Sequence, residues 1–184
     1  MGSSDLHMKA RRVWFAIVAA VLPLLPASAH AATPRTLVAK IEHVSDGDTI
    51  TAVTENQTKL RLRLLGVDAP EIPHGKKPGQ PFGQEAREHL ARLIGGRTIQ
   101  VETYGPDRFK RILAVAFLGP VNVNVEMVEQ GLAEVYRGAP CQVYCRDLRV
   151  AELRAKRDRV GMWAQGPEYE SPRVFRQRLK IRGD

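Results

Sequence analysis

The feature that most restricts how this chain can fold is a run of five strand-like segments between Thr36 and Leu118. Apolar and β-branched residues are frequent along these segments, and within residues 36–44 and 59–67 they alternate with polar ones, as in strands that bury one face. Polar or glycine-containing turns separate several of them, among them DGDT after the first segment and TENQT after the second. The predicted strands cover residues 36–44, 49–53, 59–67, 98–104 and 111–118.

Helical patterns complete the expected fold. Residues 84–94 carry an apolar face that ends at two glycines, and a short helix is predicted between Asn122 and Gly131. A longer helix begins near residue 145, and Trp163 is expected to close the core behind it. This helix is expected to direct four residues inward: Leu148, Ala151, Leu153 and Ala155. We therefore predict an α+β, mainly β protein, an OB-fold five-stranded Greek-key barrel with three helices.

The first 32 residues are expected to be a signal peptide. Three basic residues precede the apolar run VWFAIVAAVLPLLP, and ASAHAA supplies small residues for cleavage. The apolar run is too short for a comfortable membrane span, so the sequence favours a secreted or periplasmic protein. Residues 1–7 resemble a cloning remnant, with a natural extension as the alternative.

A globular domain is predicted over residues 36–165. A basic, partly disordered tail follows over 166–184, with a short helix around 174–181.

Charge and cysteine content suggest partners and a compartment. The net charge is +8, and removing the signal peptide takes away three bases and one acid, so the remainder is still basic. This balance indicates a polyanionic partner, nucleic acid or an acidic membrane, or else a solvated surface that favours solubility.

Cys141 and Cys145 predict a disulfide in an oxidising compartment, with two free thiols as the alternative.

Four acidic residues stand where predicted strands end: Asp46, Asp48, Asp68 and Glu71. Pro70 biases the residue before it toward an extended backbone, so Asp68 and Glu71 can turn toward one place. If the barrel brings the first turn beside the second, Asp48 meets Asp68. Two carboxylates with a backbone carbonyl and water suit Ca²⁺. Taken alone, DGDT is more typical of an ordinary hairpin turn.

Two arginines near these acidic residues are suited to binding phosphate. Arg63 lies within the strand LRLRLLGV, and Arg111 begins the strand RILAVAFL. A guanidinium can hold a phosphate through two parallel hydrogen bonds. Each arginine alone is typical of a surface ion pair. Together with the four acids and the basic chain, they indicate a phosphate site.

Six motifs, in their order along residues 37–165, resemble the staphylococcal nuclease (thermonuclease) family. They are SDGDTITA, LRLLGVDAPE, FGQEAREHL, DRFKRILAVAF, VEMVEQGLAEVY and AELRAKRDRVGMW. The resemblance implies an OB-fold, Ca²⁺-dependent phosphodiesterase that cleaves DNA and RNA with little sequence specificity.

The resemblance also implies which residues would bind the metal. Asp48 and Asp68 match the family's metal-binding carboxylates. Ala69 matches a position whose backbone carbonyl binds the metal and whose side chain is often Thr. Asp46 matches a less essential acid close to the metal.

Catalytic and substrate-binding roles are implied in the same way. Glu71 matches the proposed general base, and Arg63 and Arg111 match the two arginines that clamp the phosphate. Phe109 stands where the best-known member has Tyr. Three further residues are expected near the nucleic acid: Lys76, Lys77 and Tyr136.

Two other functions stay open from sequence. The first is a non-catalytic OB module that binds nucleic acid. The second is an interaction domain whose basic tail binds an acidic membrane. We favour a nuclease, because every matched chemical position keeps its functional group apart from the side chain at Ala69. A monomer is expected.

Overall fold

The computed structural model describes residues 34–139 and 141–181. The predicted signal peptide (1–32, with the cloning remnant 1–7) and the last three residues of the tail lie outside the described residues. Within the described ranges, no helix combines the length and apolar character that a bilayer crossing requires.

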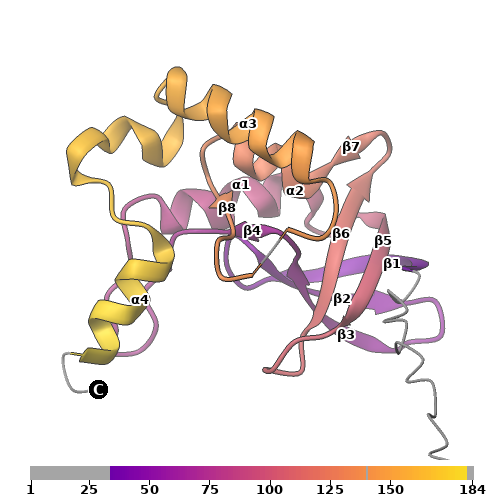
Figure 1. Cartoon of the computed structure of the whole chain (residues 1–184). Coiled ribbons are helices and arrows are strands. Elements are labelled where there is room, and N and C mark those ends of the chain that lie inside the picture. The colour runs from indigo at the N-terminus through magenta and orange to yellow at the C-terminus, as the bar shows by residue number, and fades with distance from the viewer. Residues whose placement is uncertain (1–33, 140, 182–184) are drawn as a thin grey trace, which may run out of the picture. The chain divides into compact units, whose positions relative to one another are not determined.

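Five strands close into a barrel (Figure 1). They are β1 (Arg35–Val44), β2 (Thr49–Thr54), β3 (Lys59–Leu64), β5 (Thr98–Pro106) and β6 (Ile112–Leu118). Neighbouring strands pair antiparallel in the order β3-β2-β1-β5-β6, and parallel pairing of β3 with β6 joins the two edges. The closed mixed barrel confirms the predicted fold class.

Three short strands extend this framework. β7 (Val121–Asn122) continues the sheet beyond β6, and β4 (Val67–Asp68) pairs with β8 (Glu134–Val135). In the second pair, Asp68 lies opposite Glu134. The β4–β8 pair therefore holds the segment that follows β3 at a defined position beside the chain that leads to the last helices.

Alternation along the strands separates the core from the site. On β3, Leu62 and Leu64 are buried, whereas Arg61 is exposed and Arg63 is partly buried. Buried side chains from the other strands fill the same core, among them Ile41, Ile50, Val101, Ala114 and Ala116. Burial of these apolar side chains is the main favourable contribution to folding.

The helices cover the barrel and extend past it. They are α1 (Gly83–Ile94), α2 (Val123–Glu129), α3 (Cys145–Arg157), the 3₁₀ helix η1 (Gly161–Glu168) and α4 (Pro172–Ile181). Asn122 caps α2 by accepting a hydrogen bond from the N–H of Val125, as expected of an asparagine at this position. α2 lies between α3 and the barrel strands (Figure 1).

Two predictions about the core around α3 are wrong. Leu153 is 67% exposed, and Glu152 is buried in its place. The buried residues of α3 are Leu148, Ala151, Glu152 and Ala155. Their spacing follows the helical period, which places Leu153 outside the buried stripe. Trp163 is only partly buried, whereas its neighbour Met162 is fully buried.

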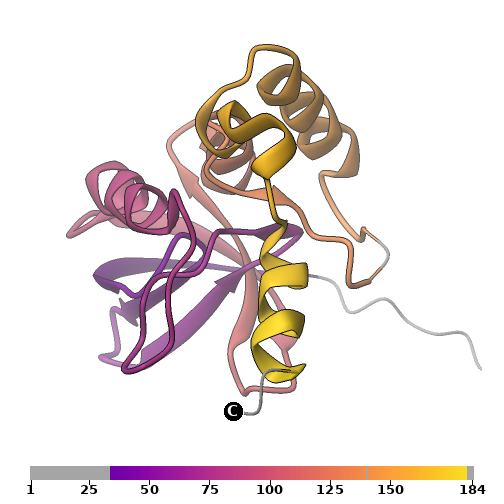
Figure 2. The ribbon, with the colours of Figure 1, turned by 90° about the vertical axis from the view of Figure 1, so that its left-hand side faces the viewer.

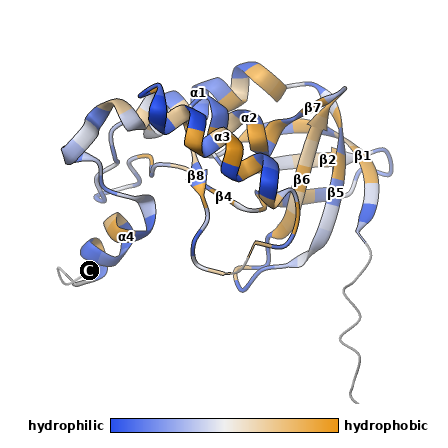
Figure 3. Cartoon of the chain, turned by 45° about the horizontal axis from the view of Figure 1, so that its top comes forward, coloured by the Kyte–Doolittle hydropathy of each residue, from blue (hydrophilic) through white to orange (hydrophobic). Residues whose placement is uncertain are grey.

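The tail forms the helix α4, which confirms the short helix predicted around residues 174–181 and adds to the three helices predicted for the barrel domain. α4 begins at Pro172, two residues before the expected start. Figure 2 shows α4 beside the loop that connects β4 to α1, and Figure 3 shows that hydrophilic residues make up much of this helix. The tail therefore packs against the segment that follows Asp68.

Candidate active site

The turn between β1 and β2 is packed tightly against its neighbours. Asp46 Oδ1 accepts a hydrogen bond from the backbone N–H of Asp48 at 3.0 Å. A Cβ at Gly47 would lie 2.7 Å from Cβ of Ala69 and 2.8 Å from Cβ of Ala86. Only glycine lets the turn pack at this distance. The close approach brings the turn against the segment that follows β4.

Arg63 lies between the two predicted metal-binding aspartates. Its Nη1 is 2.5 Å from Oδ2 of Asp48, and its Nη2 is 3.1 Å from Oδ1 of Asp68. The β2–β3 ladder pairs Arg63 with Thr49 and so places it next to Asp48. The structure thus brings Asp48 and Asp68 to one guanidinium, which offsets the repulsion between two nearly buried carboxylates.

Asp48 carries a charge that its surroundings compensate only in part. Its Oδ2 accepts a hydrogen bond from the N–H of Ala69 at 2.9 Å, and its Oδ1 accepts one from Oγ1 of Thr49 at 3.1 Å. Burial raises the pKa of Asp48 to about 6 despite the lowering effect of Arg63, and Asp46 adds to the rise. An additional cation would therefore stabilise the ionised form of this carboxyl.

Arg111 is oriented by the turn that precedes its strand. Its Nε lies 2.8 Å and its Nη2 lies 2.7 Å from Oδ2 of Asp107, while Nη1 lies 3.3 Å from Oγ1 of Thr49. The other oxygen of Asp107 accepts the backbone N–H groups of Phe109 and Arg111. Thr49 therefore connects Arg111 to Asp48, and both predicted clamp arginines lie near the same acidic turn.

A cavity of about 400 Å³ opens beside the two arginines. Arg63 and Arg111 line it together with Phe109, Tyr136 and Cys141. Phe109 is 60% exposed, and the Arg108 and Arg111 guanidiniums lie 4.7 and 5.4 Å from its ring centroid. The cavity lining combines three arginines with two aromatic rings, a composition that suits a nucleotide.

The loop that contains Cys141 forms part of this wall. The sulfur atoms of Cys141 and Cys145 are bonded to each other, with their Cα atoms 5.8 Å apart. The N–H of Tyr136 donates to the carbonyl of Gly66 at 2.9 Å, which fixes the start of the loop. Tyr136 thus lies at the cavity near Arg63, in the region where the sequence places it.

Glu71 lies at the base of the loop that precedes α1. Its N–H donates to Oε1 of Gln80 at 3.0 Å, and its carbonyl accepts the N–H of Gln80 at 2.8 Å. The Glu71 side chain is 36% exposed, so water reaches it. Lys77 lines a cavity with Glu71, whereas Lys76 lies exposed at the tip of the loop. This loop closes on itself and brings one of its two lysines near the predicted base.

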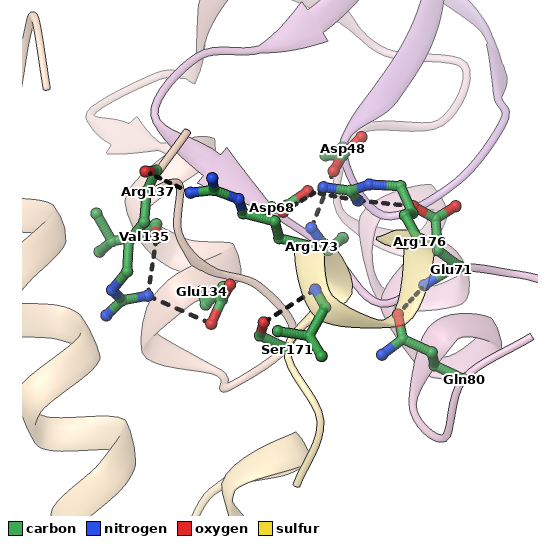
Figure 4. Close-up of polar contacts among 12 residues, drawn as sticks. Asp48, Asp68, Glu71, Gln80, Glu134, Val135, Arg137, Ser171, Arg173 and Arg176 are labelled. Atoms are coloured by element: carbon green, nitrogen blue, oxygen red, sulfur yellow. Dashed lines mark hydrogen bonds and ion pairs between the residues drawn. The ribbon is translucent and has the colours of Figure 1, made fainter. Parts of the chain in front are cut away.

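Arg176 of α4 also enters the site, and nothing in the sequence singles it out. Its Nη2 lies 2.7 Å from Oδ2 of Asp68, and its Nη1 lies 3.0 Å from Oδ1 of Asp68 and 2.7 Å from Oε1 of Glu71 (Figure 4). Burial lowers the pKa of Arg176, but the bonds to Asp68 and Glu71 outweigh it and raise that pKa overall. The tail helix therefore supplies a cation to both carboxylates.

The oxygen donors at this site fit a hard divalent cation. Among residues 34–139 and 141–181, no group of three or more His, Cys, Asp or Glu side chains could by itself hold a metal ion. The predicted set is different, because it consists of Asp48, Asp68, the carbonyl of Ala69 and water. Carboxylate and carbonyl oxygens with several waters are ligands that Ca²⁺ accepts. The under-compensated charge of Asp48 is consistent with such an ion.

Sequence reasoning missed four residues that contribute to this geometry: Thr49, Gln80, Asp107 and Arg176. Asp107 had a signal, because an aspartate in a turn often accepts N–H groups two residues later. Thr49 follows Asp48 directly in DGDT. Gln80 and Arg176 had none, since their contacts depend on how the loop and the tail pack.

Comparison with known proteins gives a consistent result. A family model described as "Staphylococcal nuclease homologue" matches residues 61–165. A protein of Verticillium alfalfae named "Probable endonuclease LCL3" is 32% identical, over 79% of this chain and 61% of its own length. A protein with the same name from Scheffersomyces stipitis is 38% identical, over 70% of this chain and 59% of its own length.

The match to a bacterial relative covers a larger share of that relative's length. The "Uncharacterized endonuclease" of Haemophilus influenzae is 32% identical, over 77% of this chain and 74% of the relative. By contrast, this chain spans about three fifths of each of the two LCL3 proteins above.

Proposed function

Because this chain belongs to the staphylococcal nuclease family, we propose that it is a Ca²⁺-dependent endonuclease that hydrolyses the phosphodiester bonds of DNA and RNA with little sequence specificity. The observation that carries this proposal is the position of Arg63 between Asp48 and Asp68, with Arg111 and Glu71 close by. It combines candidate metal ligands, phosphate binders and a water-accessible base in one place.

In this proposal, the two arginines bind the scissile phosphate. Attack by water adds negative charge to a phosphodiester that is already anionic, and guanidinium groups aimed at that charge stabilise the transition state. Arg63 has to exchange part of its contact with Asp48 or Asp68 for a phosphate oxygen. Arg111 keeps its contact with Asp107 and offers its Nη1 edge, which now contacts Thr49.

Glu71 acts as the general base. It takes a proton from the attacking water, whose oxygen forms the new bond to phosphorus while the bond to the leaving oxygen breaks. Asp48, Asp68 and the carbonyl of Ala69 would hold Ca²⁺, with Asp46 close to them. When bound, Ca²⁺ would supply positive charge next to the phosphate. Lys77, Lys76 and Tyr136 would contact the nucleic acid outside the reacting phosphate.

We further propose that the protein acts as a monomer outside the cytoplasm, in the periplasm or after secretion. The bond between Cys141 and Cys145 supports an oxidising compartment. The apolar leader seen in the sequence supports export.

The test is digestion of single-stranded DNA and of RNA by the purified protein, with Ca²⁺ and with EDTA. Glu71→Gln is expected to lower the cleavage rate by about 100-fold or more, while Glu55→Gln, at an exposed residue in the β2–β3 turn, serves as the matched control. Cleavage should need Ca²⁺. If the nucleic acid is bound but never cut with any divalent ion, the non-catalytic binding module is the correct function.

A further inference from the structure

Arg176 occupies both oxygens of a carboxylate that the reaction needs. It forms a two-pronged pair with Asp68, at 2.7 Å and 3.0 Å, and one of its nitrogens also bonds Glu71 at 2.7 Å. Arg63 takes a further position on Oδ1 of Asp68, at 3.1 Å. The Asp68 side chain is 1% exposed, so solvent does not compete for it. The candidate metal ligand and the candidate base thus share one cation from the tail.

The helix that carries Arg176 is only lightly attached. Among the α4 side chains that the structure describes, Pro172 and Phe175 are buried, and the others are partly or fully exposed. Phe175 lines a cavity with Pro70 and Pro78 of the loop beside the site. A helix with so few buried apolar contacts belongs to the less stable part of a fold. Docking of α4 therefore rests on few contacts: the packing of Phe175, the Arg173 hydrogen bond to Arg137, and the bonds that Arg176 forms with Asp68 and Glu71.

The charge of α4 explains why its arginine enters an acidic site. The helix contains no acidic residue and four basic ones: Arg173, Arg176, Arg178 and Lys180. Arg178 pairs with Glu170 just before the helix, and Arg173 donates to the carbonyl of Arg137. Arg176 is the one that the packing of Phe175 directs to Asp68 and Glu71. Its guanidinium places a positive charge directly beside these two carboxylates.

We propose that Arg176 is an internal cation that caps Asp68 and Glu71 in the resting protein and competes with the divalent ion for them. The inference rests on the proposed function, because it takes Asp68 as a metal ligand. A carboxylate held at both oxygens by a guanidinium is not free to bind a metal, so Arg176 has to leave first. Docking of α4 and binding of Ca²⁺ then weaken each other by the same factor.

The size of the effect follows from how often α4 is docked. The apparent dissociation constant of a ligand rises in inverse proportion to the competent fraction. If α4 is undocked in about 1–10% of molecules, Ca²⁺ binds about 10- to 100-fold more weakly than it would without Arg176. Removal of the guanidinium should restore that affinity.

The test is calorimetric titration of the purified protein with Ca²⁺ in the absence of nucleic acid. Arg176→Gln is expected to bind Ca²⁺ at least about tenfold more tightly than the unaltered protein. The matched control is Arg173→Gln, which removes the same charge from the same helix but does not touch Asp68 or Glu71. Its affinity should stay within about twofold of the unaltered protein.

A second measurement uses the protein without any substitution. Addition of Ca²⁺ should speed hydrogen exchange of the α4 amides, residues 172–181, and leave those of α3 unchanged. Equal Ca²⁺ affinity in the Arg176→Gln variant and the unaltered protein, or slower exchange in α4 with Ca²⁺, would overturn this inference and leave the nuclease proposal intact. If Ca²⁺ binds none of the variants, both proposals fail. If the competition is seen but no substrate is cut, the nuclease proposal alone fails.

Discussion

Asp107 holds Arg111 through one carboxylate oxygen, with Nε at 2.8 Å and Nη2 at 2.7 Å. Asp107→Asn replaces this charged pair with a neutral contact, so Arg111 is expected to lose its orientation. We expect kcat/KM for DNA to fall about tenfold, against about 100-fold for Arg111→Ala. Steady-state kinetics on both variants give the comparison. A positioning role further requires that Asp107→Asn add no loss in an Arg111→Ala background. An additional tenfold loss there would show that Asp107 acts independently of Arg111.

Arg63 should be the more sensitive of the two arginines, because it also neutralises Asp48 and Asp68. Arg63→Ala is expected to lower the cleavage rate by about 100-fold or more. Arg63→Lys should recover only part of this loss, since an ammonium group lacks the planar fork that reaches two carboxylates at once. Single-turnover cleavage of a short DNA measures both. A wild-type-like rate in Arg63→Ala would refute the assigned role.

The ionisation of Asp48 should destabilise the metal-free protein. Its pKa is about 6 in the folded state against 3.8 when unperturbed, mainly because the group is buried. Between these values the folded state binds more protons than the unfolded state, so this group's contribution to stability falls as pH rises from about 4 to about 6. Asp48→Asn removes that contribution. Urea unfolding in EDTA across this range should therefore show that the free energy of unfolding of the variant increases relative to that of the parent as pH rises. Parallel stability profiles would contradict the pKa.

Glu152 should be a stabilising residue on α3. Its carboxylate accepts the N–H of Val135 at 2.9 Å and pairs with Arg137 at 2.6 Å and Lys156 at 2.9 Å. Glu152→Gln is expected to cost about 2 kcal/mol at pH 7, because a buried acceptor loses its charged partners. Chemical unfolding measures this. The matched control is Glu129→Gln, an exposed partner of Arg154, which should cost less than about 0.5 kcal/mol.

The ionisation of Glu152 should also make the stability of the protein depend on pH. Burial would raise the pKa of Glu152, but Lys156, the Val135 N–H and Arg137 hold it below the ordinary 4.5. The stability that this shift contributes is present above pH 4.5 and is lost as pH falls through the folded-state pKa. The difference between the parent and Glu152→Gln should therefore shrink in acid. A difference that stays constant down to pH 3 would contradict the assignment.

Lys110 adopts a left-handed backbone, with φ at 61°, in the turn that presents Arg111. This region costs a side-chain-bearing residue about 1 kcal/mol or more, and glycine avoids the cost. Lys110→Gly is expected to raise the free energy of unfolding by about 0.5–1 kcal/mol. Lys110→Ala keeps the Cβ and should bring no gain, so it separates backbone strain from loss of the lysine charge. A stabilising alanine variant would point to charge instead.

Local periodicity accounts for what could be predicted. Alternation along β3 separates Arg61 and Arg63 from Leu62 and Leu64, and this pattern is visible in the residues themselves. The turn that follows places Asp68 only a few residues further along the same ribbon. Where side-chain type was weighed instead of period, the prediction was wrong, as Leu153 shows. The helical period places Glu152 in the interior. Its ion pairs with Arg137 and Lys156 compensate the charge buried there.

By itself, the sequence determined the barrel and the residue types of its site, since alternation, turns and motif order act over a few residues at a time. Only the tertiary structure decided which charges meet. Asp48 reaches the Ala69 segment because Gly47 packs against Ala69, just after β4, and against Ala86 of α1. Arg176 reaches Asp68 across 108 positions of sequence because Phe175 docks beside the loop. The four cations of α4 look equivalent in sequence, and packing selects one of them.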